Sequence, residues 1–80
     1  MSNIKPLIEA LLFIHGKNGI SNTQLLEILK IKEEVLQSEI NELMEHFQNK
    51  DRGLEIKKFG NKYLLVTKSD IYDNLFPEKN

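Results

Sequence analysis

The side chains with the greatest potential for chemistry are two histidines and a group of glutamates. His15 and His46 fall in different predicted helices, and the chain has no cysteine. A zinc site needs three or four convergent nitrogen, sulfur or oxygen ligands, and a catalytic triad needs a nucleophile beside its base. The four glycines are isolated, which excludes a glycine-rich phosphate loop. We therefore predict that the chain is not an enzyme, holds no metal or cofactor, and uses both histidines structurally.

The glutamates lie on one long predicted helix, within the segment Lys32 to Lys50. Five glutamates and no Lys or Arg lie between Glu33 and Asn49. On a helix surface, such carboxylates are better interpreted as a solvated face than as an acid/base pair. The apolar residues of the same segment recur at spacings of three and four, which predicts one buried helix face: Leu36, Ile40, Leu43, Met44 and Phe47.

Positive charge gathers further along the chain. The segment from Lys50 to Lys68 has six cations and two acids, a local charge of +4 in a chain whose net charge is -1. Such a segment could touch phosphate without sequence preference, but lysines on a hairpin more often keep an edge strand soluble. We favour the second interpretation because no ladder of aromatic residues accompanies the cations. The candidate weak phosphate contacts are Arg52, Lys57, Lys58 and Lys62.

Three helices are expected to position these charges. The first is predicted over Ile4 to His15 and ends at Gly16. Ser21, with Gln24 three residues later, forms a capping-box pattern that begins a short second helix. The glutamate-rich helix follows after a tight connection, so the order is that of a helix-turn-helix.

A β-hairpin is expected after Gly53, where the apolar period changes from 3.6 to 2. Gly60 and Asn61 supply a two-residue turn, which would place Ile56 opposite Leu65 and Lys58 opposite Tyr63. Leu54, Ile56, Tyr63 and Leu65 would then face the helices, whereas Leu64 and Val66 would point the other way. Ser69 is predicted to cap a last short helix. The fold class is therefore α+β and mainly helical: a winged helix-turn-helix domain over residues 1–76, with 77–80 as the start of a linker to a second domain.

The first predicted helix has an unusually wide apolar surface. Beyond its expected core stripe, it carries four further apolar residues: Leu7, Ala10, Phe13 and Ile14. One interpretation is that this helix lies centrally and is buried on several sides. The other is that these four residues form a subunit interface, because a large exposed apolar patch is a liability on a monomer. The longest apolar run near the N-terminus is too short to span a membrane, so no membrane association is expected.

A winged helix most often binds duplex DNA through its third helix, which makes a DNA-binding transcriptional regulator the alternative function. The charges argue against it. Duplex DNA presents about one negative charge per 1.7 Å, so a third helix with five glutamates would be repelled along its docking surface. Sequence-specific DNA binding is therefore not expected.

Several segments of the chain resemble the N-terminal winged-helix domain of segregation and condensation protein B. The similar segments are Ile8 to Gly16, IEALLFIHG, and the wing, in which Gly53-Leu54-Glu55 precedes Leu65-Val66-Thr67. The resemblance covers nearly the whole chain. A mild departure is Lys30, at a position where the family often has glycine.

This resemblance implies a non-catalytic subunit of the bacterial SMC condensin, acting in chromosome condensation and segregation in the cytoplasm at the nucleoid. Members carry two winged-helix domains, form homodimers through the first, and bind the kleisin subunit, segregation and condensation protein A. The second domain is expected to make most of the kleisin contact. The apolar set Leu7, Ala10, Phe13 and Ile14 is what a dimerising winged helix needs.

Overall fold

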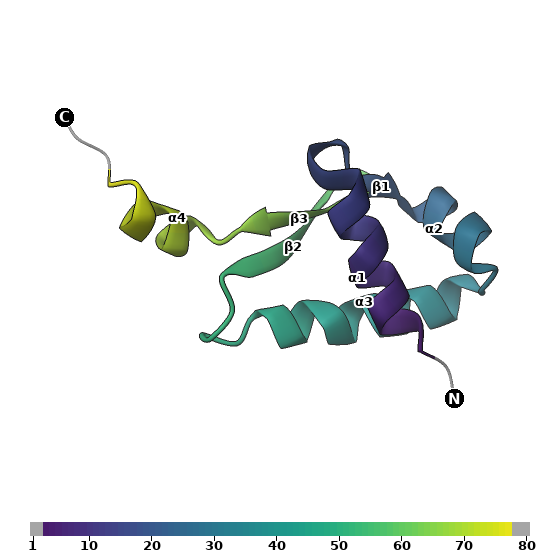
Figure 1. The fold of residues 1–80 in the computed structure, drawn as a ribbon. Coiled ribbons are helices and arrows are strands. Elements are labelled where there is room, and N and C mark those ends of the chain that lie inside the picture. Colours follow the sequence, from purple (N-terminus) through teal and green to yellow (C-terminus); the bar gives the residue numbers. More distant parts are fainter. Residues whose placement is uncertain (1–2, 78–80) are drawn as a thin grey trace.

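The structure is a computed structural model that describes residues 3–77. Its elements are α1 (Ile4–His15), a 3-10 turn η1 (Gly16–Asn18), β1 (Ile20–Ser21), α2 (Asn22–Leu29), α3 (Glu33–Phe47), β2 (Leu54–Phe59), β3 (Lys62–Thr67) and α4 (Ser69–Leu75) (Figure 1). This order confirms the predicted winged helix-turn-helix fold. Of the predicted linker 77–80, residues 78–80 lie outside the described part of the chain.

The predicted capping box at the start of α2 is present. The Ser21 hydroxyl accepts a hydrogen bond from the Gln24 backbone N–H at 3.1 Å, and the Gln24 side chain accepts one from the Ser21 backbone N–H at 3.0 Å. At its other end α2 stops at Lys30, which is left-handed with φ 55° and ψ 50°. Glycine is the residue best suited to this conformation. Lys30 therefore has a backbone conformation that a glycine would adopt with less strain.

The core lies between α1, α3 and the inner face of the wing. Ile8 and Leu12 of α1 are fully buried, as are Leu25 of α2 and Leu36 of α3. The predicted α3 stripe is confirmed, with Met44 partly buried at its margin. The remaining core residues come from β1, α3 and the wing: Ile20, Ile40, Leu43, Phe47, Ile56 and Tyr63.

The three strands form an antiparallel sheet in the order β1-β3-β2. The predicted register is confirmed, with Ile56 opposite Leu65 and Lys58 opposite Tyr63. Gly60 has φ 62° and leads the two-residue turn, as a glycine-first hairpin requires. Ile56 and Tyr63 are buried as expected, but Leu54 remains 40% exposed because it borders an open groove.

The outer side of the wing is more covered than its pattern suggested. Leu64 was predicted to point away from the helices, yet it is half-buried. The chain near η1 passes over it, and a Cβ at Gly19 would lie only 3.0 Å from Leu64 Cγ. Glycine at this position therefore allows the close approach of the two backbones.

The last helix, α4, follows the wing and lies outside the compact body (Figure 1). The prediction that Ser69 caps it is wrong: the N-cap is Lys68, and Ser69 is the first helical residue. Lys68 has the extended backbone of an N-cap because its N–H still bonds to the Gly53 carbonyl at 2.9 Å, which continues the hairpin pairing. The Lys68 carbonyl accepts the first helical hydrogen bond, from the Tyr72 N–H at 2.9 Å, so the helix begins one residue earlier than Ser69 capping would require.

Candidate functional site

The four candidate interface residues all lie on the outer side of α1. Phe13 is 77% exposed, Ile14 72% and Leu7 50%, and Ala10 is also exposed. They occur at the spacings of three and four that bring residues to one side of a helix. The interpretation that the single chain buries α1 on several sides is therefore wrong for the outer side of the helix. The outer side of α1 is an uncovered apolar surface.

This surface continues into a groove between the end of α1 and the wing. Phe13 forms one edge of the groove, and the other apolar residues come mainly from β2 and β3. Sequence reasoning did not assign these wing residues to a site, although apolar Leu64 and Val66 on the outer side of a predicted hairpin were the available signal. The groove is lined by Leu12, Phe13, Gly16, Lys17, Leu54, Leu64, Leu65 and Val66.

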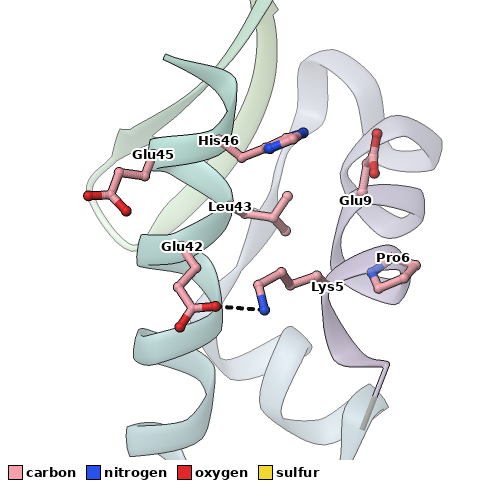
Figure 2. Close-up of a pocket in the computed structure, with 7 residues that line it drawn as sticks. All are labelled: Lys5, Pro6, Glu9, Glu42, Leu43, Glu45 and His46. Carbon is pink, nitrogen blue, oxygen red and sulfur yellow. Dashed lines mark ion pairs between the residues drawn. The ribbon is translucent and has the colours of Figure 1, made fainter. Parts of the chain in front are cut away.

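The acidic side of α3 is partly neutralised from α1. Lys5 Nζ lies 2.9 Å from a Glu39 carboxylate oxygen. It also lies 2.7 Å from a Glu42 carboxylate oxygen, the pair that Figure 2 shows. Hydrogen bonding to Glu42, and then to Glu39, raises the pKa of the Lys5 ammonium group above its usual range. Glu39 and Glu42 therefore pair with α1, although the Glu42 side chain, at 57% exposure, is still on the solvated face. Their carboxylates help to join α1 to α3.

Polar side chains of the helix-turn-helix also bond within the domain. The Asn22 amide donates to both Glu33 carboxylate oxygens, at 3.1 and 3.2 Å. Gln37 Nε2 donates to the Tyr63 hydroxyl at 3.3 Å and lies 3.5 Å from Asn22 Oδ1. Gln37 and Asn41 are the two α3 residues whose side-chain amides could pair with adenine, and Gln37 is held against the wing instead. The Gln37 side chain therefore links α3 to the wing.

The two histidines do not meet. His46 accepts a hydrogen bond at its Nε2 from Arg52 Nη2, at 2.9 Å, because a guanidinium has only donors. His46 borders an open groove between α1 and α3, with Glu45 pointing away from α1 (Figure 2). Within residues 3–77, no three His, Asp or Glu side chains converge in a way that could hold a metal ion.

The four candidate phosphate contacts are spread over the wing. Arg52 is bonded to His46 at the base of the hairpin. Lys58 lies over the Tyr63 ring, with Nζ 5.6 Å from the centroid, so it shares the helix-facing side of the hairpin. Lys57 and Lys62 alternate to the opposite side. The structure therefore does not gather these four cations into one phosphate-binding surface.

Comparison with known proteins identifies the family. The family model described as segregation and condensation complex subunit ScpB matches residues 6–77. The chain belongs to the ScpB family. Segregation and condensation protein B of Bacillus pumilus is 34% identical over 68 residues, and that of Malacoplasma penetrans is 36% identical over 70 residues. These matches cover 85% and 86% of this chain but only 34% and 36% of the relatives. The chain thus spans about a third of the length of the ScpB proteins it matches.

A solved ScpB structure has the same fold. The crystal structure of a dimer of the ScpB N-terminal domain complexed with ScpA peptide superposes with a TM-score of 0.87 at 31% identity, over 94% of this chain and 89% of that one. In that ScpB protein, the N-terminal domain is the part that was crystallised with the ScpA peptide. As for membranes, none of the helices between residues 3 and 77 has the length and apolar content to cross a bilayer.

Proposed function

We propose that this chain is a dimerising, non-catalytic domain of a bacterial SMC condensin, acting in chromosome condensation and segregation. Its work is association: it pairs two copies of the subunit so that they act together on one kleisin, segregation and condensation protein A. The site of action is the cytoplasm, at the nucleoid. The domain takes the place of the N-terminal winged helix in a two-domain subunit.

The observation that carries this proposal is the uncovered outer side of α1. Phe13 and Ile14 expose about three-quarters of their surface. Burial of apolar surface contributes about 25 cal/mol per Å², reduced by the entropic cost of association. A second copy provides the same apolar surface, which a two-fold interface can bury against itself. The ScpB N-terminal domain of similar fold is itself a dimer.

Kleisin binding is proposed from the same relative. Its N-terminal domain is complexed with a ScpA peptide. We therefore revise the expectation that a second domain makes most of the kleisin contact, and propose that this domain contributes to kleisin binding directly. The alternative, a transcriptional regulator that reads the DNA major groove, has less support. Gln37 is hydrogen-bonded to Tyr63, and α3 contains five glutamates but no Lys or Arg.

The test is light scattering on the purified chain, alone and with its kleisin, in the wild type and in two double variants. Phe13→Asp with Ile14→Asp places charge on the outer side of α1. Ile28→Asp with Val35→Asp is the matched control, because these residues are also exposed, at 51% and 40%, but lie on α2 and α3.

We expect the wild type and the control to have a mass near twice 9.3 kDa and to bind the kleisin. The α1 variant should be a folded monomer. A monomeric wild type that also fails to bind the kleisin would contradict the proposed function. If the control dissociates and the α1 variant does not, the interface lies on the α2 and α3 side instead.

A further inference from the structure

The helix α4 and its C-cap residue, Phe76, expose large apolar side chains to solvent. Tyr72, Leu75 and Phe76 are 52%, 62% and 63% exposed, and the Tyr72 and Phe76 rings pack together with centroids 5.1 Å apart. Near the body, a Cβ at Gly53 would lie 3.7 Å from Ile71 Cγ2, so the first turn of α4 is the part that touches the wing. An isolated helix of seven residues is marginal in water. This helix therefore needs a further surface to pack on.

A suitable surface exists in the groove between the end of α1 and the wing, but α4 cannot reach it within its own chain. A chain reversal needs two central residues, and only Lys68 separates β3 from α4. Lys68 is also fixed, because its backbone N–H bonds to the Gly53 carbonyl and its Nζ bonds to the Asn49 carbonyl at 2.8 Å. The helix is therefore directed away from its own body (Figure 1).

The area needed by a stable dimer points to a second copy as the occupant of the groove. A fully exposed large side chain offers about 200 Å², so Leu7, Phe13 and Ile14 together offer about 400 Å². A stable interface buries about 800 Å² on each partner. Tyr72, Leu75 and Phe76, at the exposures given above, add about 350 Å² on the same scale. The α1 surface alone is too small, whereas α1 and α4 together are close to sufficient.

Charge agrees with this pairing. The helix α4 carries Asp70 and Asp73 and no cation. Among residues 3–77, the charged residue that lines the groove is Lys17, in η1. An acidic, apolar helix and an apolar groove with a cationic edge are complementary, and they occur once each on every copy.

We propose that α4 is an exchanged arm: in the dimer, α4 of each copy inserts Tyr72, Leu75 and Phe76 into the groove of the other copy. This inference rests on the proposed dimer and specifies how the two copies are joined. The exchange is reciprocal, so the dimer contains two identical arm contacts related by a two-fold axis.

The reciprocity gives a complementation test by sedimentation of fluorescently labelled full chains. The arm variant is Leu75→Asp with Phe76→Asp, and the groove variant is Leu54→Asp with Lys17→Glu. A homodimer of either variant loses both arm contacts. A mixed dimer of the two variants keeps one contact, because the intact arm of the groove variant can bind the intact groove of the arm variant. We expect each variant alone to dimerise at least 100-fold more weakly than the wild type. The mixed dimer should have a dissociation constant near the geometric mean of the wild-type and variant values.

The control adds a charge to α4 on the side away from Tyr72 and Phe76, by Asn74→Asp, and should dimerise as the wild type does. Variants that dimerise normally, or a mixture that is no tighter than the single variants, would overturn the exchange while leaving the proposed dimer intact. A wild type that never self-associates would overturn both.

A second measurement does not depend on charged substitutions in the wing. Because the chain has no cysteine, Phe76→Cys in one copy and Leu54→Cys in another supply a single reactive pair. Mild oxidation of the mixture should give a disulfide-linked dimer. Phe76→Cys mixed with Glu34→Cys, an exposed position on α3, is the control and should link much more slowly. Equal rates of linking would overturn the exchange.

Discussion

The two sides of α1 have similar chemistry and opposite environments. Ile8 and Leu12 are fully buried in the core, whereas Phe13 and Ile14, one and two residues beyond Leu12, are 77% and 72% exposed. Hydrophobicity alone does not separate the two sides. The inner side is covered by α3 and the wing of the same chain, and the outer side has no element of residues 3–77 packed over it. The inner side therefore determines folding, and the outer side is available for assembly.

The largest effect on stability is expected from the inner side. Leu12→Ala should lower the free energy of unfolding by about 2–5 kcal/mol, because it removes a fully buried side chain and leaves a cavity. Thermal denaturation followed by circular dichroism measures the change. Ile14→Ala is the matched control on the outer side and should change monomer stability by less than about 0.5 kcal/mol. Equal losses for the two variants would contradict the distinction between the sides.

On the outer side, Ala10→Glu should act on assembly and not on folding. Ala10 is exposed in the single chain, so the glutamate is solvated in the monomer. In the dimer the same carboxylate would be buried without a partner, which should raise the dissociation constant at least about tenfold, or 1.4 kcal/mol. Sedimentation at several concentrations measures this constant. An unchanged constant would exclude Ala10 from the interface.

A smaller effect is expected where α3 meets the wing. Gln37→Leu removes the hydrogen bond to the Tyr63 hydroxyl and should cost about 1 kcal/mol of stability. Asn41→Leu, on the exposed side of the same helix, is the control. Neither change should alter binding to duplex DNA, as measured by fluorescence anisotropy at low and moderate salt. A specific loss of DNA binding on either change would support the regulator alternative.

The connection between α2 and α3 offers a stabilising change. The backbone of Lys30 is in the left-handed region, which costs a residue with a side chain about 1–2 kcal/mol relative to glycine. Against this gain, glycine loses about 0.5–1 kcal/mol more backbone entropy on folding. Lys30→Gly should therefore raise the free energy of unfolding by about 0.5–1 kcal/mol, measured by urea denaturation. Lys32→Gly, at a position with extended backbone, should destabilise instead.

The smallest effect is expected from the ion pairs of Lys5. Hydrogen bonds to Glu42 and Glu39 raise the pKa of Lys5 in the folded protein. The ion pairs therefore stabilise the fold fully at pH values below the usual lysine pKa, and this stabilisation is lost as the pH rises through the raised pKa of Lys5. Lys5→Met should lower the melting temperature only slightly at neutral pH, because exposed pairs contribute little. The difference from wild type should shrink in high salt and at strongly alkaline pH. A difference that persists in both would indicate a packing role instead.

Much of the fold followed from local patterns. The bounds of α1, the Ser21 capping box and the hairpin register each depend on residues within a few positions of one another, and each was confirmed. Ser69 was wrongly predicted as the N-cap because serine is common at that position. Lys68 is the N-cap instead, and its extended backbone is held by the hydrogen bond from its N–H to the Gly53 carbonyl. That bond joins residues 15 positions apart and leaves no local signal.

The interaction surfaces were only partly predictable. The excess of apolar residues on α1 indicated a surface to be covered, but two interpretations stayed open until the exposure of Phe13 and Ile14 was known. The pairing of Lys5 with Glu39 and Glu42 depends on how α1 crosses α3, which periodicity does not specify. The groove beside Leu54 and the outward direction of α4 likewise depend on tertiary arrangement.

The most direct test of the account is sedimentation equilibrium of the 80-residue chain over a wide concentration range. The account predicts a reversible monomer–dimer equilibrium that reaches a mass near twice 9.3 kDa. The Phe13→Asp, Ile14→Asp variant should remain monomeric over the same range with its fold intact. A wild-type chain that stays at 9.3 kDa at every concentration would contradict the claim that the outer side of α1 is an interface between two copies.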